Sequence, residues 1–110
     1  MKNLLLILSL TLIYSLGFSQ KVFKTQYDYQ ADIKVYSVQY DYQADLIVYS
    51  VKYDYQANKD GLWFFTANDY QADKKVFFTN YDYQADLKIF FADNDYQAGW
   101  KNNAKQYLLK

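Results

Sequence analysis

The chain has 110 residues, room for one small domain, and its 12 basic residues balance 12 acidic ones. Every basic residue is lysine and every acidic one aspartate, and the sequence contains no cysteine, histidine or proline. This composition excludes a disulfide framework, a thiolate nucleophile and histidine-based proton transfer. Without arginine or excess positive charge we expect no nucleic-acid partner, and aromatic residues at 22% argue against disorder.

Residues 1–19 have the layout of a secretory signal peptide. Lys2 follows the amino terminus, residues 4–16 are mostly apolar, and Gly17 and Ser19 are the small residues expected before cleavage after Ser19. The apolar run is shorter than the roughly 20 residues that a membrane-spanning helix needs. We therefore expect an exported protein, periplasmic or extracellular, whose single mature domain covers residues 20–110 and has no membrane span.

A tetrapeptide, Asp-Tyr-Gln-Ala, recurs six times in the remaining sequence, with spacings of 13, 13, 15, 13 and 13 residues. The six copies are Asp28, Tyr29, Gln30, Ala31; Asp41, Tyr42, Gln43, Ala44; Asp54, Tyr55, Gln56, Ala57; Asp69, Tyr70, Gln71, Ala72; Asp82, Tyr83, Gln84, Ala85; and Asp95, Tyr96, Gln97, Ala98. Runs of β-branched and aromatic residues separate the copies, which is typical of strands. The sequence thus predicts an all-β domain of six tandem units closed into one compact fold.

The alternation of apolar and polar residues predicts that the strands run through the Asp-Tyr-Gln-Ala motif itself. Every second residue in the range 36–44 is apolar, so Tyr40 and Tyr42 are expected to face the core, together with most other tyrosines. Strand alternation has a period of two, whereas most units have 13 residues, an odd number. Each unit therefore needs one change of phase, which we expect as a bulge near Val48 and Tyr49.

Other motif positions carry structural expectations. The alanine is expected where another backbone passes closely, and the Asp or Asn that follows it suits a turn. The six glutamine amides are expected to satisfy backbone groups where strands cross, with a polar ligand-binding ring as the alternative. The two-residue insertion, within residues 58–61, is the clearest loop signal and divides the copies into three and three.

No catalytic or metal-binding constellation emerges from the spacing. The aspartates recur once per unit, so they are expected to be spread around the fold instead of converging on one substrate or calcium ion. Ser37 and Ser50 have no base nearby in the motif. We expect no enzymatic activity, cofactor or metal. Trp63 and Trp100 are the candidate exposed aromatics for ligand binding, although a buried tryptophan is the commoner outcome.

The sequence favours a non-enzymatic structural or binding protein that is a monomer. One alternative is a carbohydrate or small-ligand binding module that uses the tryptophans and surface tyrosines. A second is a fibre or matrix protein, because Tyr/Gln-rich β-repeats can stack as cross-β structure. A third is a hydrolase with paired aspartates.

The repeat resembles a known family in three features. These are the tandem Tyr-Asp-Tyr-Gln-Ala-Asp motif, the Gly-Leu-Trp-Phe break at residues 61–64, and the closing Gln-Ala-Gly-Trp-Lys of residues 97–101, followed by Leu108 and Leu109. Together they resemble the septoil-knot domain family over residues 22–110. The chain departs from the motif at Asn68 and Asn94, which replace its first tyrosine, and at Gly99, which replaces its closing aspartate.

The resemblance implies a small exported bacterial protein of unknown function whose chain forms a seven-crossing torus knot. Such a knot follows a path that circles an axis twice. With three units in each lap, every unit would lie beside the unit three further along the chain. The insertion at residues 58–61 would then be the step between the two laps.

Overall fold

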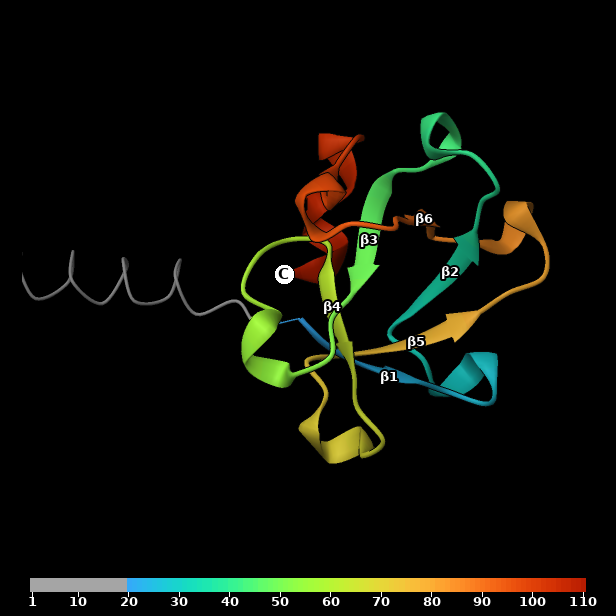
Figure 1. Cartoon of the computed structure of the whole chain (residues 1–110). Helices are drawn as coiled ribbons and strands as arrows, with labels where there is room; N and C mark the ends of the chain where they lie inside the picture. Colours follow the sequence, from blue (N-terminus) through green and yellow to red (C-terminus); the bar gives the residue numbers. More distant parts are fainter. Residues whose placement is uncertain (1–19) are drawn as a thin grey trace, which may run out of the picture.

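The computed structural model describes residues 20–110, and the predicted signal peptide, residues 1–19, lies outside them. Within the described range, short strands alternate with 3₁₀ turns (Figure 1). The strands are β1 (Lys21–Lys24), β2 (Ile33–Ser37), β3 (Leu46–Ser50), β4 (Leu62–Phe65), β5 (Lys74–Phe78), β6 (Leu87–Phe91) and β7 (Gly99–Trp100). The 3₁₀ turns are η1 (Asp28–Gln30), η2 (Asp41–Gln43), η3 (Asp54–Gln56), η4 (Asp69–Gln71), η5 (Asp82–Gln84), η6 (Asp95–Gln97) and η7 (Asn103–Leu109).

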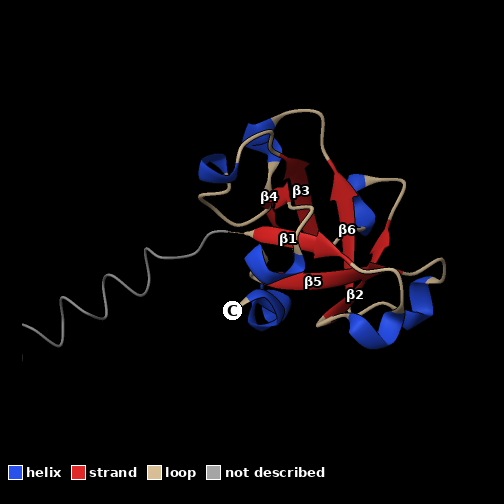
Figure 2. Cartoon of the chain, turned by 90° about the horizontal axis from the view of Figure 1, so that it is seen from below, coloured by secondary structure: helices blue, strands red, loops and turns tan. Residues whose placement is uncertain are grey.

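Strands β1 to β6 form a closed parallel barrel. Their order is β4-β1-β5-β2-β6-β3, and pairing of β3 with β4 completes the ring (Figure 2). The short strand β7 pairs antiparallel with β3. Closure gives each of the six strands a partner on both sides, so none presents a fully unpaired edge. The expected all-β fold of tandem units closed into one domain is confirmed.

The chain passes around the barrel twice. Strands β1, β2 and β3 occupy alternate positions, and β4, β5 and β6 fill the positions between them. Pairing of β1 with β4, β2 with β5 and β3 with β6 places each strand beside the one three further along, as the repeat arithmetic predicts. Among these six, β3 and β4 are the consecutive strands that pair directly, and the insertion at residues 58–61 lies between them. The insertion is the step between laps.

Stagger of the strands allows connections much shorter than the helical crossovers that usually join parallel strands. Val76 in β5 is aligned with Lys24, at the end of β1, and also with Ile33, at the start of β2. The end of β1 therefore lies near the start of β2, and residues 25–32 suffice to join them. The turn η1 within this connection lies against β5, the strand that the connection crosses.

One residue from the middle of each strand fills the barrel. These central residues follow the repeat spacing, and each is at most 1% exposed: Val22, Val35, Val48, Trp63, Val76 and Ile89. Five of them are β-branched, and the sixth, Trp63, packs its indole ring among the others in the core. The interior is therefore filled by side chains, as small barrels require.

The two ends of the barrel are covered differently. Leu109 in the carboxy-terminal turn η7 joins the buried core and lines a cavity of about 10 Å³ with Val22 and Trp63, near the start of the strands. At the strand ends, the rings of Phe65, Phe78 and Phe91 lie 6.2–6.4 Å apart between centroids. Hydrophobic packing thus closes both ends.

The aspartate that closes the motif ties each crossing connection to the strand beneath it. In the connection from β1 to β2, Asp32 donates its backbone N–H to the carbonyl of Lys75 at 2.8 Å, and its Oδ2 accepts from the Lys75 N–H, also at 2.8 Å. The same two-bond clamp joins Asp45 to Lys88, Asp73 to Lys21 and Asp86 to Lys34. The carboxylate thereby takes the place of a backbone carbonyl just before the chain enters the ladder.

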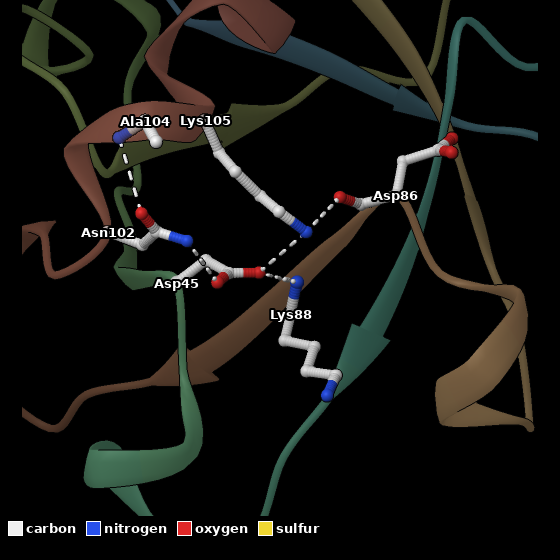
Figure 3. Close-up of polar contacts among 6 residues, drawn as sticks. All are labelled: Asp45, Asp86, Lys88, Asn102, Ala104 and Lys105. Atoms are coloured by element: carbon white, nitrogen blue, oxygen red, sulfur yellow. Dashed lines mark hydrogen bonds and ion pairs between the residues drawn. The ribbon is translucent and has the colours of Figure 1, made fainter.

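One clamp also anchors the carboxy-terminal segment (Figure 3). The backbone carbonyl of Asp45 accepts from the N–H groups of Lys101 and Asn102, and its Oδ1 accepts from Asn102 Nδ2 at 3.2 Å. Lys105 Nζ lies 3.5 Å from Asp45 Oδ2 and donates to the Asp86 carbonyl at 2.9 Å. Asn102 caps η7 by accepting from Ala104 N–H.

The step between the laps has its own polar fastening. Gly61 has a φ of +90°, and a Cβ there would lie 2.5 Å from the carbonyl oxygen of Ile47, so only glycine fits. Its N–H donates to Gln20 Oε1, while Gln20 Nε2 and Trp100 Nε1 donate to the two oxygens of Asp60 at 2.9 Å.

The prediction that strands run through the motif is wrong. Each Asp-Tyr-Gln segment is a 3₁₀ turn, and β2 ends at Ser37 before the alternating residues do. The bulge expected near Val48 and Tyr49 is likewise absent from β3, because residues 46–48 pair one to one with β6 and residues 49–50 pair one to one with β4. The 3₁₀ turn interrupts the alternation of inward and outward side chains between one strand and the next, so the strands need no bulge.

We predict that Asp86→Ala destabilises the fold by about 1–2 kcal/mol, because the Lys34 N–H loses its charged acceptor. Asp86→Asn, which keeps an oxygen, should lose less. Asp82→Ala is the matched control, since no described residue bonds the Asp82 side chain, and it should change stability by no more than about 0.5 kcal/mol. Urea unfolding of the three variants measures this, and equal losses for Asp86→Ala and Asp82→Ala would contradict the clamp.

Candidate functional site

The repeated turns are built by their glutamines. In η2, the Oε1 of Gln43 accepts from the backbone N–H of Tyr40 at 3.3 Å, and the carbonyl of Tyr40 accepts from the Gln43 N–H at 3.1 Å. Equivalent side-chain bonds occur at Gln30, Gln56 and Gln97, whereas Gln71 and Gln84 accept from the hydroxyls of Thr66 and Thr79. The glutamines therefore stabilise their own turns. Their predicted place at strand crossings is wrong, because the closing aspartates occupy it.

This turn geometry directs the motif tyrosines outward. The second tyrosine of each copy is 73–80% exposed, from Tyr29 in η1 to Tyr96 in η6. The first tyrosine, where present, is 48–55% exposed. The prediction that most tyrosines lie in the core is wrong, since it rested on strand alternation that the turns interrupt.

The exposed rings form pairs. Ring centroids lie 5.5 Å apart for Tyr27 and Tyr29, and the two planes differ by 7°. The corresponding centroid distances are 5.6 Å for Tyr40–Tyr42, 5.7 Å for Tyr53–Tyr55 and 5.6 Å for Tyr81–Tyr83. Asn68 and Asn94 replace the first ring in η4 and η6, which leaves Tyr70 and Tyr96 without that partner. Pairing is thus a property of four copies.

Two surface grooves of about 400 and 390 Å³ lie between turns of the first and second laps. The first is lined by Tyr36, Val38, Gln39, Gln43, Asp82 and Lys88. The second is lined by Tyr49, Val51, Lys52, Tyr55, Gln56, Asn58, Leu62 and Asp95. A shift of 13 residues converts five members of the first set into members of the second. The repeat therefore produces the same groove twice.

Each groove combines an aromatic and aliphatic surface with amide, carboxylate and ammonium groups. In the first, the Asp82 carboxylate and the Lys88 ammonium make no bond or ion pair within residues 20–110. Both groups can therefore bind an external ligand, as can the Nε2 of Gln43, whose Oε1 already accepts from Tyr40 N–H. Volumes of this size lie within the range of small-ligand sites, about 300–1,000 Å³.

The two candidate tryptophans lie in different environments. Trp63 has no exposed surface, and its Nε1 is a buried nitrogen without a hydrogen-bond partner. Trp63 therefore has the buried position that is commoner for tryptophan, and the speculative role for its ring in ligand binding is wrong, because that ring fills the barrel. Trp100 is half-buried and donates to Asp60 at 2.9 Å. A role for Trp100 in ligand binding stays a prediction.

The described aspartates do not gather into a metal site, since residues 20–110 contain no group of three potential carboxylate ligands. The six motif aspartates lie one per turn, on η1 to η6. In the same range, no helix is long and apolar enough to span a membrane.

A family model described as a 7(1) septoil knot domain matches residues 19–101. The chain belongs to this family. Searches of curated proteins and of solved structures gave no match. The suspected septoil-knot family is thereby confirmed.

Sequence reasoning missed the tyrosine pairs and the grooves of this septoil-knot domain. One available signal was the position of the glutamine in each motif. It lies three residues after the one that precedes the turn, and a polar side chain at that position can accept a hydrogen bond from the backbone where the turn begins. Read as a capping box, the motif would have indicated turns with outward tyrosines. The grooves had no local signal, because their walls come from units in different laps.

We predict that Gln43→Ala costs about 0.5–1.5 kcal/mol, because Tyr40 N–H loses its acceptor within η2. Tyr42→Ser should change stability by no more than about 0.5 kcal/mol, since that ring is 74% exposed. Urea unfolding distinguishes the two. A Tyr42→Ser variant as unstable as Gln43→Ala would show that the ring is part of the fold's stabilising packing.

Proposed function

We propose that this septoil-knot domain is an exported, non-enzymatic protein that binds carbohydrate in its repeated grooves. The observation that carries the proposal is the tyrosine present in all six turns and at least 73% exposed in each. The buried core does not include these rings. The six rings stand on separate turns, and one of them, Tyr55, lines the second groove.

The chemistry of the grooves supports carbohydrate as the ligand class. Sugars combine apolar faces with hydroxyl groups, and tyrosine offers both a ring to stack on and a hydroxyl to bond. Gln43, Asp82 and Lys88 supply an amide, an acceptor and a donor around the first groove. The second groove offers Gln56, Asp95 and Lys52 in the same roles.

Closure of the barrel favours a binding protein over the fibre alternative. Cross-β stacking needs strands with unpaired edges, whereas β1 to β6 each have partners on both sides. Export is supported by the signal-like residues 1–19, and the absence of an enzymatic role by motif aspartates placed one per turn.

A persistent scaffold is the second part of the proposal. The family description names a 7(1) knot, and we include a knotted chain in the proposal. The two-lap path supports it, since each lap fills the gaps left by the other. A chain of this kind unfolds slowly, because the barrier to opening controls its lifetime.

We predict two bound ligands per chain, one in each groove. Soluble oligosaccharides titrated into isotope-labelled protein should shift backbone amide signals of residues 36–43 and 49–56 together. Lys88→Ala should weaken the first groove by about tenfold, as expected for a lost charged hydrogen bond. Lys59→Ala, a lysine outside both linings, is the control. A panel of neutral and charged oligosaccharides that leaves both grooves unshifted would reject carbohydrate as the ligand.

We predict that native trypsin cleaves after Lys59 well before Lys34 or Lys88. Lys59 is exposed in the step between laps, whereas Lys34 and Lys88 lie within paired strands. Cleavage inside the strands requires the barrel to open. Peptide mapping over time measures the order, and early cleavage after Lys34 or Lys88 would contradict a persistent barrel.

A further inference from the structure

The paired tyrosines have chemistry that ligand binding does not use. Two phenol rings face each other at 5.5–5.7 Å on four separate turns, with the ring planes within 7° in three of them. All eight rings are at least 48% exposed, so a soluble oxidant can reach them. Such an arrangement brings together the two reactants of oxidative phenol coupling.

Other side chains that compete for one-electron oxidation are scarce in this chain. The sequence has no cysteine or histidine, and its single methionine is Met1. Of the two tryptophans, Trp63 has no exposed surface and Trp100 is half-buried. Cysteine and methionine are the usual first targets of oxidants in proteins. Here the surface offers tyrosine instead.

We propose that each paired turn is an oxidative modification site at which its two tyrosines couple to form dityrosine. The co-reactant is a one-electron oxidant, such as a haem peroxidase with hydrogen peroxide. Each phenol gives up one electron and one proton, and the two radicals join through ring carbons beside the hydroxyls. The two ring hydrogens then move to restore both phenols, so one peroxide and two tyrosines yield one dityrosine and two waters.

Proximity makes coupling within a turn faster than coupling between chains. Well-oriented groups in one molecule react with effective molarities of about 10⁵ M or more, far above any protein concentration. Tyr70 and Tyr96, whose turns carry asparagine in place of the first ring, lack this advantage. The chain thus contains four reactive turns and two internal controls.

Coupling would bridge the residue that precedes a turn and the second residue of that turn. In η3 the bridge would join Tyr53, before the turn, to Tyr55 within it, alongside the bond from Tyr53 N–H to Gln56 Oε1. The covalent link would fix an exposed segment that is otherwise held by a few hydrogen bonds. This modification needs no bound carbohydrate, so it can be tested without a ligand.

The test treats dilute full-length mature protein with peroxidase and hydrogen peroxide, followed by denaturation, trypsin and mass spectrometry. Three pairs fall in peptides with no other tyrosine, namely residues 25–34, 53–59 and 76–88. Each of these peptides is expected to lose two hydrogens, with dityrosine fluorescence, at a rate independent of protein concentration. Peptides 60–74 and 89–101, which carry Tyr70 and Tyr96, should show no loss of two hydrogens and no dityrosine fluorescence in the monomer.

Tyr53→Asn is the matched variant, because Asn94 occupies the same position in η6 and keeps the bond from its N–H to the turn's glutamine at 3.2 Å. It should abolish coupling in peptide 53–59 and leave the other two peptides unaffected. Amide spectra confirm that the variant is folded. The proposal is overturned if Tyr55 in this variant is modified as before within the monomer. It is also overturned if covalent dimers through Tyr70 and Tyr96 form as fast as the pair products.

Discussion

The barrel depends on the clamp between a motif's closing aspartate and the backbone of the strand that its connection crosses. A chain that passes over a paired strand meets that strand's N–H and C=O groups without a strand of its own to pair with them. Asp32, Asp45, Asp73 and Asp86 solve this by offering one backbone donor and one carboxylate acceptor at each crossing. Four crossings are therefore fastened in one way, by a residue type that also tolerates turns.

The clamp explains where the repeat departs from its own motif. Asn58 replaces the aspartate in the third copy, where the chain steps to the neighbouring strand β4 and crosses none. Gly99 replaces it in the sixth, where the chain pairs antiparallel with β3 as β7. The fastening of the step comes instead from Asp60, which accepts from Gln20 and Trp100. These two changes at the position of the closing aspartate follow the topology, since both fall where the chain crosses no strand in the usual way.

Much of the fold could be predicted, because the 13-residue spacing of the copies shows how many units there are and where they lie along the chain. The all-β class, the two laps and the step at residues 58–61 all follow from where the copies and the insertion lie. The exposed tyrosines could not be predicted. The alternation of apolar and polar residues through Tyr40 and Tyr42 is the same whether this segment forms a strand or a turn. The Gln43 bond to Tyr40 N–H decides for the turn and moves both rings into solvent. The grooves remained hidden because their two walls, such as Gln43 and Asp82, belong to different laps.

The alternation of the laps has a consequence for how the protein forms. Every ladder within the six-stranded ring joins a first-lap strand to a second-lap strand, and β1, β2 and β3 make none among themselves. The first half of the chain has no sheet of its own, although it contains three complete units. During synthesis on a ribosome, the strands of the first half have no strands to pair with until the second half of the chain emerges. Although the protein consists of six similar units, three of them alone therefore cannot form a smaller barrel of the same kind. Its folding is dominated by distant pairings, which are the slow kind.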